Sequence, residues 1–206
     1  MAGFANLSQA WMAWDGPAQA PGDAVLDRTR ELDKFLADVE RRAFRIAQVS
    51  LRDADDALDV VQDSMLKLAR SYGERPSAEW RPLFYRILEN AIRDLQRRRM
   101  VRKRLMVWMP SAKDDPDEEA ENPLDNVAAG GPDAPELLMQ AEAMRQLEIS
   151  LRALPARQRE AFMLRNFEGM DVAETAAAMG CSEGSVKTHY SRAVHTLRTQ
   201  LGEVWR

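Results

Sequence analysis

The chain has 206 residues, of which 45% are hydrophobic and 30% charged, and its formal net charge is −4. This composition is typical of a globular protein and excludes a disordered chain, and no apolar run approaches the length that crosses a bilayer. The acidic total also argues against a chain that binds DNA strongly by itself, because neutralising phosphates supplies most of the non-specific affinity for DNA.

The first part of the chain predicts a leader followed by helices. Residues 1–26 carry Gly, Pro and Ala without a clear period, and we interpret them as a weakly ordered leader. Apolar residues then recur every three or four positions through Phe35–Ala47 and again through 55–72, which predicts two amphipathic helices. Gly73 ends the second helix, and residues 73–77 are expected to form a loop.

A third helix, which Ser77 can cap, is aromatic in its first half and basic in its second half, where seven Lys or Arg residues fall within positions 93–104. Aromatic faces can stack unpaired bases while basic side chains follow the phosphate backbone. The alternative is that Trp80, Phe84 and Tyr85 belong to the core, and Phe84 fits the apolar stripe. The dense basic cluster favours a polyanion, since like charges repel one another.

Residues 107–135 differ from everything around them. They contain several prolines, two adjacent glycines and the acidic run that begins at Asp114. Few apolar residues could anchor this segment, so we interpret it as a flexible acidic linker between a domain at 27–106 and a second domain at 136–206. The predicted fold is all-α, with two small helical domains on a tether.

The second domain ends in the pattern of a helix-turn-helix. Asp171 can cap a short helix over 172–179, Gly180 suits a tight turn with positive φ, and Ser182 can cap a final helix that reaches about Leu201. Small residues of the first helix are expected to face inward, as are Val186 and Tyr190, which would face that first helix. These small residues are Val172, Ala173, Ala176 and Ala177.

The outer side of the final helix carries hydrogen-bond donors with few carboxylates, a surface that suits phosphates and base edges in a major groove. These residues are Ser185, Lys187, Thr188, His189 and Arg192. A generic helical hairpin with a solvated polar face is the alternative. The lone Cys181 lies in the turn, where a small apolar residue packs well.

A cluster of three acids and a glutamine marks the helix before the loop: Asp56, Asp59, Gln62 and Asp63. Neighbouring carboxylates can bind metal or act in acid–base catalysis, but no histidine lies near, so a surface that binds a protein partner is favoured. One cysteine and two histidines in the whole chain exclude an internal disulfide and are few ligands for zinc. We therefore expect no enzyme, no metal and no cofactor, and no signal peptide is evident at the N-terminus.

Several segments together resemble the sigma-70 family of RNA polymerase subunits, in particular its small extracytoplasmic-function (ECF) type. Residues 56–63 are similar to the family's polymerase-binding helix, and residues 83–98 to the helix that engages the −10 promoter element. Residues 154–162 match the motif with which the family's −35-reading domain begins. Residues 169–174 and 180–188 match the next parts of that domain. The order and spacing of these motifs together are highly specific for the family.

The resemblance implies a cytoplasmic promoter-reading subunit, without membrane insertion, whose partners are core RNA polymerase, promoter DNA and an anti-sigma factor. It implies polymerase binding by Asp56, Asp59, Gln62 and Asp63. It implies contacts to the −10 element by Arg86, Asn90, Arg93, Arg97 and Arg98. It implies contacts to the −35 element by Ser185, Lys187, Thr188, His189 and Arg192.

Two further expectations complete the interpretation. At the −10 element, the loop 73–77 and the start of the next helix would capture a base as the duplex opens. The acidic linker would lie in the polymerase's RNA channel. Two rival functions stay open on sequence alone: an operator-binding regulator that dimerises, and a sigma-like decoy that binds polymerase or an inhibitor without starting transcription.

Overall fold

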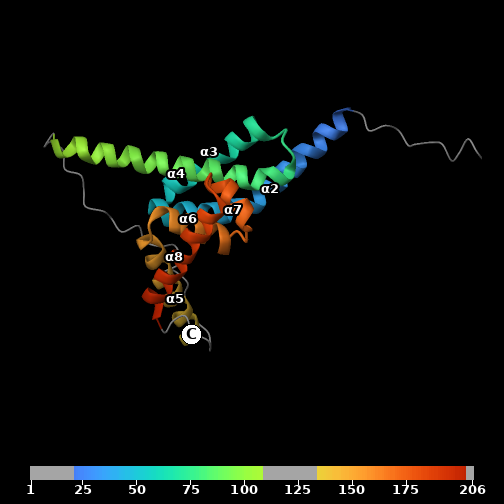
Figure 1. Ribbon diagram of the computed structural model, residues 1–206. Helices are drawn as coiled ribbons and strands as arrows, with labels where there is room; N and C mark the ends of the chain where they lie inside the picture. Colours follow the sequence, from blue (N-terminus) through green and yellow to red (C-terminus); the bar gives the residue numbers. More distant parts are fainter. Residues whose placement is uncertain (1–20, 109–133, 203–206) are drawn as a thin grey trace, which may run out of the picture.

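The computed structural model of the chain describes residues 21–108 and 134–202 (Figure 1). Every regular element in these two ranges is an α-helix, so the expected all-α class is confirmed. The helices are α2 (Pro21–Leu51), α3 (Ala54–Tyr72), α4 (Ser77–Trp108), α5 (Ala134–Ala153), α6 (Ala156–Asn166), α7 (Val172–Met179) and α8 (Glu183–Leu201). The acidic run of the expected linker and the first twenty residues of the expected leader lie outside the described residues.

The helix ends differ slightly from the expected domain boundaries. Helix α2 begins at Pro21, so the last residues of the expected leader are helical. Helix α4 extends to Trp108 and α5 begins at Ala134, so each covers one edge of the segment assigned to the linker. Each extension lengthens a helix that the sequence predicts. The residues at the expected boundaries carry no strong signal that ends a helix there.

Helices α2, α3 and α4 form the N-terminal domain (Figure 1). Asp53 caps α3, because its carboxylate accepts a hydrogen bond of 2.9 Å from the Asp56 N–H. Gly73 follows α3 where a Cβ atom would lie 2.8 Å from the Ala69 carbonyl oxygen, so the chain can turn toward α4 only without a side chain there. The loop expected at this place is therefore set by a steric requirement.

The aromatic residues of α4 belong to the core of this domain. Trp80 is 1% exposed, and Phe84 and Tyr85 are fully buried. The Phe35 ring of α2 contacts those of Trp80 and Phe84, and Phe84 contacts Tyr85, with centroids 5.1–6.2 Å apart. The interpretation of Trp80 and Tyr85 as stacking residues for unpaired bases is therefore wrong, and the core alternative, which the apolar stripe favours for Phe84, is correct for all three rings.

Helices α5 to α8 form the C-terminal domain, which contains the helix-turn-helix. Asp171 and Glu174 form a reciprocal capping box at the start of α7, with hydrogen bonds of 2.7 and 2.9 Å. Gly180 has φ of +62°, as the tight turn requires, and Ser182 caps α8. These local predictions are confirmed.

The inward faces of the helix-turn-helix differ in part from expectation. Ala176 is buried and Val172 half-buried, but Ala173 and Ala177 are exposed. The buried positions of α7 also include Thr175, Ala178 and Met179. Helix α7 buries more than one side because it contacts α4 as well as α6 and α8.

The two domains pack against each other. Helix α7 lies against α4, and α5 touches α2 (Figure 1). The buried apolar residues form one continuous cluster that includes both domains. The sequence predicts a tether between two units but contains no signal for this contact.

Candidate nucleic-acid and polymerase interfaces

Helix α8 exposes a basic, hydroxyl-bearing face. Lys187, Thr188 and Arg192 are exposed, and Ser185 and His189 are half-buried. The two hydroxyls are engaged locally, since the Thr188 hydroxyl donates to the Gly184 carbonyl at 2.9 Å and Ser185 Oγ lies 2.9 Å from Ser182 Oγ. The structure therefore places all five predicted residues on one helix, and its two cationic residues, Lys187 and Arg192, are exposed to solvent.

The opposite side of α8 is fixed to α6. Val186 and Ala193 are buried, and the Tyr190 ring stacks on Phe162 with centroids 6.3 Å apart. The Tyr190 hydroxyl donates to Asn166 Oδ1 at 3.3 Å, and the Arg165 guanidinium lies 5.7 Å from the ring centroid. Tyr190 thus faces α6, so the expectation that it faces α7 is wrong, and these contacts hold the exposed face of α8 in a defined orientation.

Helix α4 carries the five residues predicted to meet the −10 element. Asn90, Arg97 and Arg98 are exposed to solvent. Arg93 is half-buried, donates to the Glu89 carbonyl at 3.1 Å and lies 3.7 Å from a Glu160 carboxylate oxygen of α6. The Arg86 guanidinium lies against the turn of the helix-turn-helix, since a Cβ atom on Gly180 would be 3.3 Å from it. Two of the five residues therefore touch the C-terminal domain.

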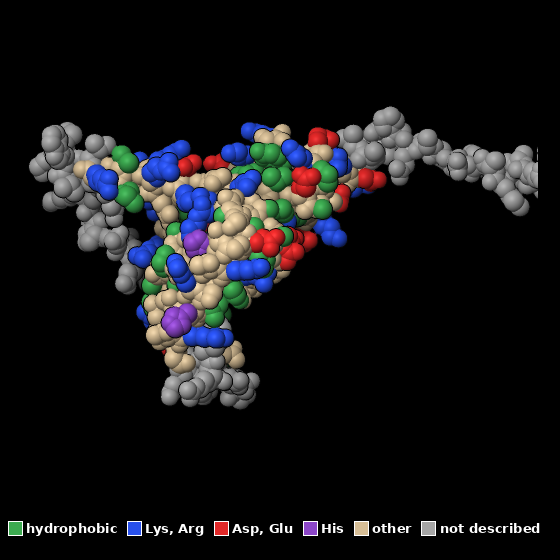
Figure 2. All heavy atoms as spheres, viewed as in Figure 1, with side chains coloured by type: hydrophobic (Ala, Val, Ile, Leu, Met, Phe, Trp, Pro, Cys, Tyr) green, Lys and Arg blue, Asp and Glu red, His purple; other side chains and the backbone are tan. Residues whose placement is uncertain are grey.

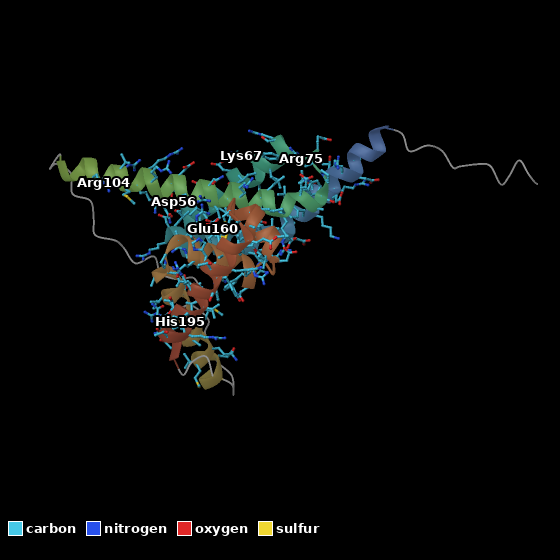
Figure 3. All side chains as sticks on the ribbon, viewed as in Figure 1. Asp56, Lys67, Arg75, Arg104, Glu160 and His195 are labelled. Atoms are coloured by element: carbon cyan, nitrogen blue, oxygen red, sulfur yellow. The ribbon has the colours of Figure 1, made fainter. Side chains whose placement is uncertain are left out.

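Basic side chains gather along this helix. Figure 2 shows lysine and arginine side chains along the α4 end of the molecule and acidic side chains at the opposite end of the N-terminal domain. Arg104, near the end of α4, is labelled at that basic end in Figure 3. Helix α4 can therefore attract a polyanion locally although the net charge of the chain is −4.

The acidic residues of α3 divide into two groups. Asp59, Gln62 and Asp63 are exposed on one side of the helix. Asp56 is half-buried and forms an ion pair with Arg99 of α4, which also lies 3.3 Å from Asp53. The structure thus brings together three of the four predicted polymerase-binding residues and turns the fourth toward α4.

Exposed leucines accompany these acids on α3. Leu58 is 43% exposed and Leu66 is 50% exposed. Leu66 lies seven positions after Asp59, hence on the same side of the helix. Sequence reasoning missed Leu66, although the seven-residue spacing could have identified it. The face therefore combines charge with apolar area, as surfaces that bind another protein do.

Three buried glutamates, Glu89, Glu160 and Glu168, lie where the domains meet. Glu168, in the connection between α6 and α7, has a fully buried side chain and accepts bonds of 3.1 and 3.2 Å from Arg42 Nε of α2. Glu160 of α6 lies 3.1 Å from Arg157 of the same helix. Figure 3 labels Glu160 beneath α4, between the two domains. Sequence reasoning missed these residues.

Burial and charge shift several pKa values at this contact. Burial, followed by the charge of Glu160, raises the pKa of the Glu89 carboxyl to about 8, against the opposing effect of Arg93, Arg159 and Arg157. Burial also raises the pKa of Glu160. Burial and then the charge of Glu168 raise the pKa of the Tyr85 phenol. The interface therefore holds acidic groups in an environment that disfavours their charge.

The described residues offer little to a metal or a small molecule. Within 21–108 and 134–202, His, Cys, Asp and Glu side chains form no group of three that could hold a metal ion. Two hollows among these residues have volumes of about 110 and 120 Å³, each too small for a cofactor. No described helix has the length and apolar character needed to span a membrane.

These interfaces belong to a defined class of protein. Residues 33–102 match the family described as Sigma-70 region 2, and residues 144–197 match Sigma-70, region 4. The first match spans α3 and most of α4, and the second contains the helix-turn-helix. The chain belongs to the sigma-70 family, and a relative named as an extracytoplasmic-function (ECF) sigma factor, described next, places it in that type; it is therefore a transcription-initiation factor and no enzyme.

Individual relatives agree with this assignment. The ECF RNA polymerase sigma factor SigM of Mycobacterium tuberculosis is 30% identical over 82% of this chain and 76% of its own length. The RNA polymerase sigma-E factor of Streptomyces coelicolor is 31% identical over 83% of this chain and 86% of its own.

Solved structures share the fold. The sigma factor RpoE of Bartonella quintana, in complex with the anti-sigma factor NepR, superposes with a TM-score of 0.56 at 24% identity, covering 83% of this chain and 96% of that one. CnrH in complex with the cytosolic domain of CnrY gives 0.52 at 22% identity, with 84% and 88% covered.

Proposed function

We propose that this chain binds core RNA polymerase in the cytoplasm, directs it to promoters through their −35 and −10 elements, and helps to open the DNA at −10. The observation that carries this proposal is the exposed face of α8, the second helix of a capped helix-turn-helix. Lys187 and Arg192 project from it, while Val186 and Ala193 anchor its other side. Such a helix can enter a major groove with donors aimed at phosphates and base edges.

Helix α4 would act at the −10 element. Asn90, Arg97 and Arg98 are exposed along it and can contact flanking bases and phosphates, with Arg86 and Arg93 joining them when the C-terminal domain moves away. The loop 73–77 and the start of α4 would hold a base taken out of the stack. Because Trp80, Phe84 and Tyr85 are core residues, the base would be held by polar contacts, which must offset a few kcal/mol of lost stacking and pairing.

The polymerase would bind the exposed side of α3. That side carries Asp59, Gln62, Asp63 and Leu66. Asp56 instead forms an ion pair with Arg99 of α4, which holds α3 against α4. A basic helical surface of the large enzyme would fit these acids. Holding both domains on one body raises the effective concentration of each DNA-reading surface near its element.

An anti-sigma factor is a further proposed partner. RpoE is in complex with the anti-sigma factor NepR in its structure, and CnrH is in complex with the cytosolic domain of CnrY. A chain of the same fold presents comparable helical surfaces. The exposed side chains of these helices would determine which anti-sigma factor binds. Co-purification with the tagged chain from its own cells would identify that partner.

Run-off transcription tests the proposal. Purified core polymerase with this chain is expected to initiate at a defined start on a promoter where core alone does not. A chain with Asp59→Asn and Asp63→Asn is expected to lose core binding, whereas Glu31→Gln with Glu40→Gln, an equal charge change at two exposed positions of α2, is expected to retain it. Palindromic footprints of the chain without core would favour an operator-binding regulator instead, and core binding without initiation would favour a decoy.

A further inference from the structure

The loop 73–77, which connects α3 to α4, is fixed at both of its ends. The Trp80 indole N–H donates to the Tyr72 carbonyl at 3.2 Å, and the backbone N–H of Arg75 donates to the same carbonyl at 2.9 Å. At the other end of the loop, the Pro76 carbonyl accepts a hydrogen bond of 2.9 Å from a backbone N–H in the first turn of α4. These contacts leave the middle of the loop to be held by another element.

Helix α2 holds the middle of the loop, and Figure 1 shows the connection between α3 and α4 beside this helix. The Arg28 guanidinium donates to the Glu74 carbonyl at 3.2 Å and lies 3.7 Å from the Glu74 carboxylate. The Glu74 side chain is 95% exposed, so the ion pair adds little and the bond to the carbonyl is the main interaction. Leu32 lies four residues further along α2, hence on the same face, and its Cδ2 is 3.5 Å from where a Cβ atom on Gly73 would lie. We call the two side chains of Arg28 and Leu32 the loop clamp.

Burial distinguishes Arg28 from the residues around it. Within 26–31 every other residue is exposed, whereas Arg28 is half-buried, as is Leu32. Both residues precede 33–102, the segment that matches Sigma-70 region 2, so that match assigns them no role. Arg28 therefore faces the loop in a part of α2 that otherwise faces solvent.

We propose that Arg28 and Leu32 are positioning residues for the −10 element, which act through the loop by holding it in the shape that receives the base. This inference rests on the proposed function, in which loop 73–77 holds a base taken out of the stack. A loop that is already held in one shape loses less conformational freedom when it binds, so its affinity for the base is higher. Polar contacts also depend on short distances and good angles, so a shift of the Glu74 backbone weakens them.

Amide hydrogen exchange of the free full-length chain tests the loop clamp without polymerase. Arg28→Ala removes the donor to the Glu74 carbonyl, so the amides of 73–77 are expected to exchange about three- to tenfold faster, which corresponds to the loss of one hydrogen bond. Arg28→Lys keeps a donor and a positive charge and should restore most of the protection. Arg30→Ala is the matched control, because Arg30 is 79% exposed and pairs with Asp27 of its own helix, so the loop amides should exchange as in the wild type.

A double-mutant cycle with promoter DNA tests whether the clamp acts through the captured base. At a promoter whose start has been mapped, each non-template base of the −10 element is replaced in turn by an abasic site, and binding of the polymerase complex is measured. One abasic position is expected to weaken binding by the wild type most. Arg28→Ala should weaken binding to the intact promoter by about three- to tenfold, and loss of that one base should then matter less, because the loop already holds it poorly. The other positions should be equally sensitive in both proteins.

Two results would overturn the proposal: loop amides of Arg28→Ala that exchange as in the wild type, or an abasic site whose cost is the same in both proteins. Run-off transcription distinguishes this failure from failure of the proposed function. If the wild-type chain directs core polymerase but the cycle shows no coupling, the positioning role alone is refuted. If the wild-type chain fails to direct core polymerase, the proposed function is refuted and the positioning role with it, whatever the exchange of the loop amides shows.

Discussion

Replacing Phe84 by alanine tests whether the aromatic residues of α4 support the fold or the DNA. The ring is fully buried and meets Phe35 and Tyr85 edge-on, with centroids 6.2 and 5.1 Å away. Truncating a buried Phe to Ala costs about 3–5 kcal/mol, within which the aromatic contacts account for about 0.5–1.5 kcal/mol each. A domain of this size is stable by about 5–15 kcal/mol, so Phe84→Ala should remain folded in buffer but lose a large share of its stability.

Urea unfolding followed by circular dichroism measures this change. The midpoint should fall sharply while the slope of free energy against urea stays constant, because the amount of surface exposed on unfolding is almost unchanged. Met100→Ala, on the same helix but 57% exposed, is the control and should change stability by less than about 0.5 kcal/mol. A Phe84→Ala protein of near wild-type stability that loses affinity for single-stranded DNA would refute the assignment of this ring to the core.

Three further outcomes are expected. Asp171→Ala removes the capping box of α7 and should lower the free energy of unfolding by about 0.5–2 kcal/mol in thermal melts; an unchanged melting temperature would contradict the role of the cap. Lys187→Ala with Arg192→Ala should weaken binding of the polymerase complex to −35 duplex and reduce its salt slope by about two; an unchanged slope would place α8 away from the phosphates. Because burial raises the pKa of Glu89 to about 8 and also raises that of Glu160, the folded chain binds protons that the unfolded chain does not, so the free energy of unfolding in urea should increase as pH falls below about 8 and decrease as pH rises through it; the reverse trend would contradict their burial.

The helix-turn-helix was predictable because its signals are local. Asp171, Gly180 and Ser182 each act on backbone within four residues, so their types and spacing are sufficient to define two caps and a turn. The exposed face of α8 follows from the same periodicity. The stripes of α3 and α4 were likewise predictable, since a buried face repeats every three or four residues.

What the sequence could not predict depends on contacts between distant segments. Arg42 and Glu168 are 126 positions apart, and nothing near either residue marks it as half of a buried pair. Tyr190 faces α6 because its hydroxyl donates to Asn166 and its ring stacks on Phe162. Helical periodicity alone does not predict which neighbouring helix a buried side chain faces. The aromatic residues of α4 were ambiguous because a core and a base-stacking surface use the same side chains, and only packing against α2 distinguishes them.

The account depends on two helical units that read two DNA elements at a separation fixed by the polymerase. Once a start site has been mapped, the most direct measurement is run-off transcription from templates whose spacer between the −35 and −10 elements is lengthened by about 5 base pairs, half a helical turn. The account predicts loss of initiation at that start, because α8 and α4 would then face elements on opposite sides of the duplex. Undiminished initiation from the lengthened template would contradict it.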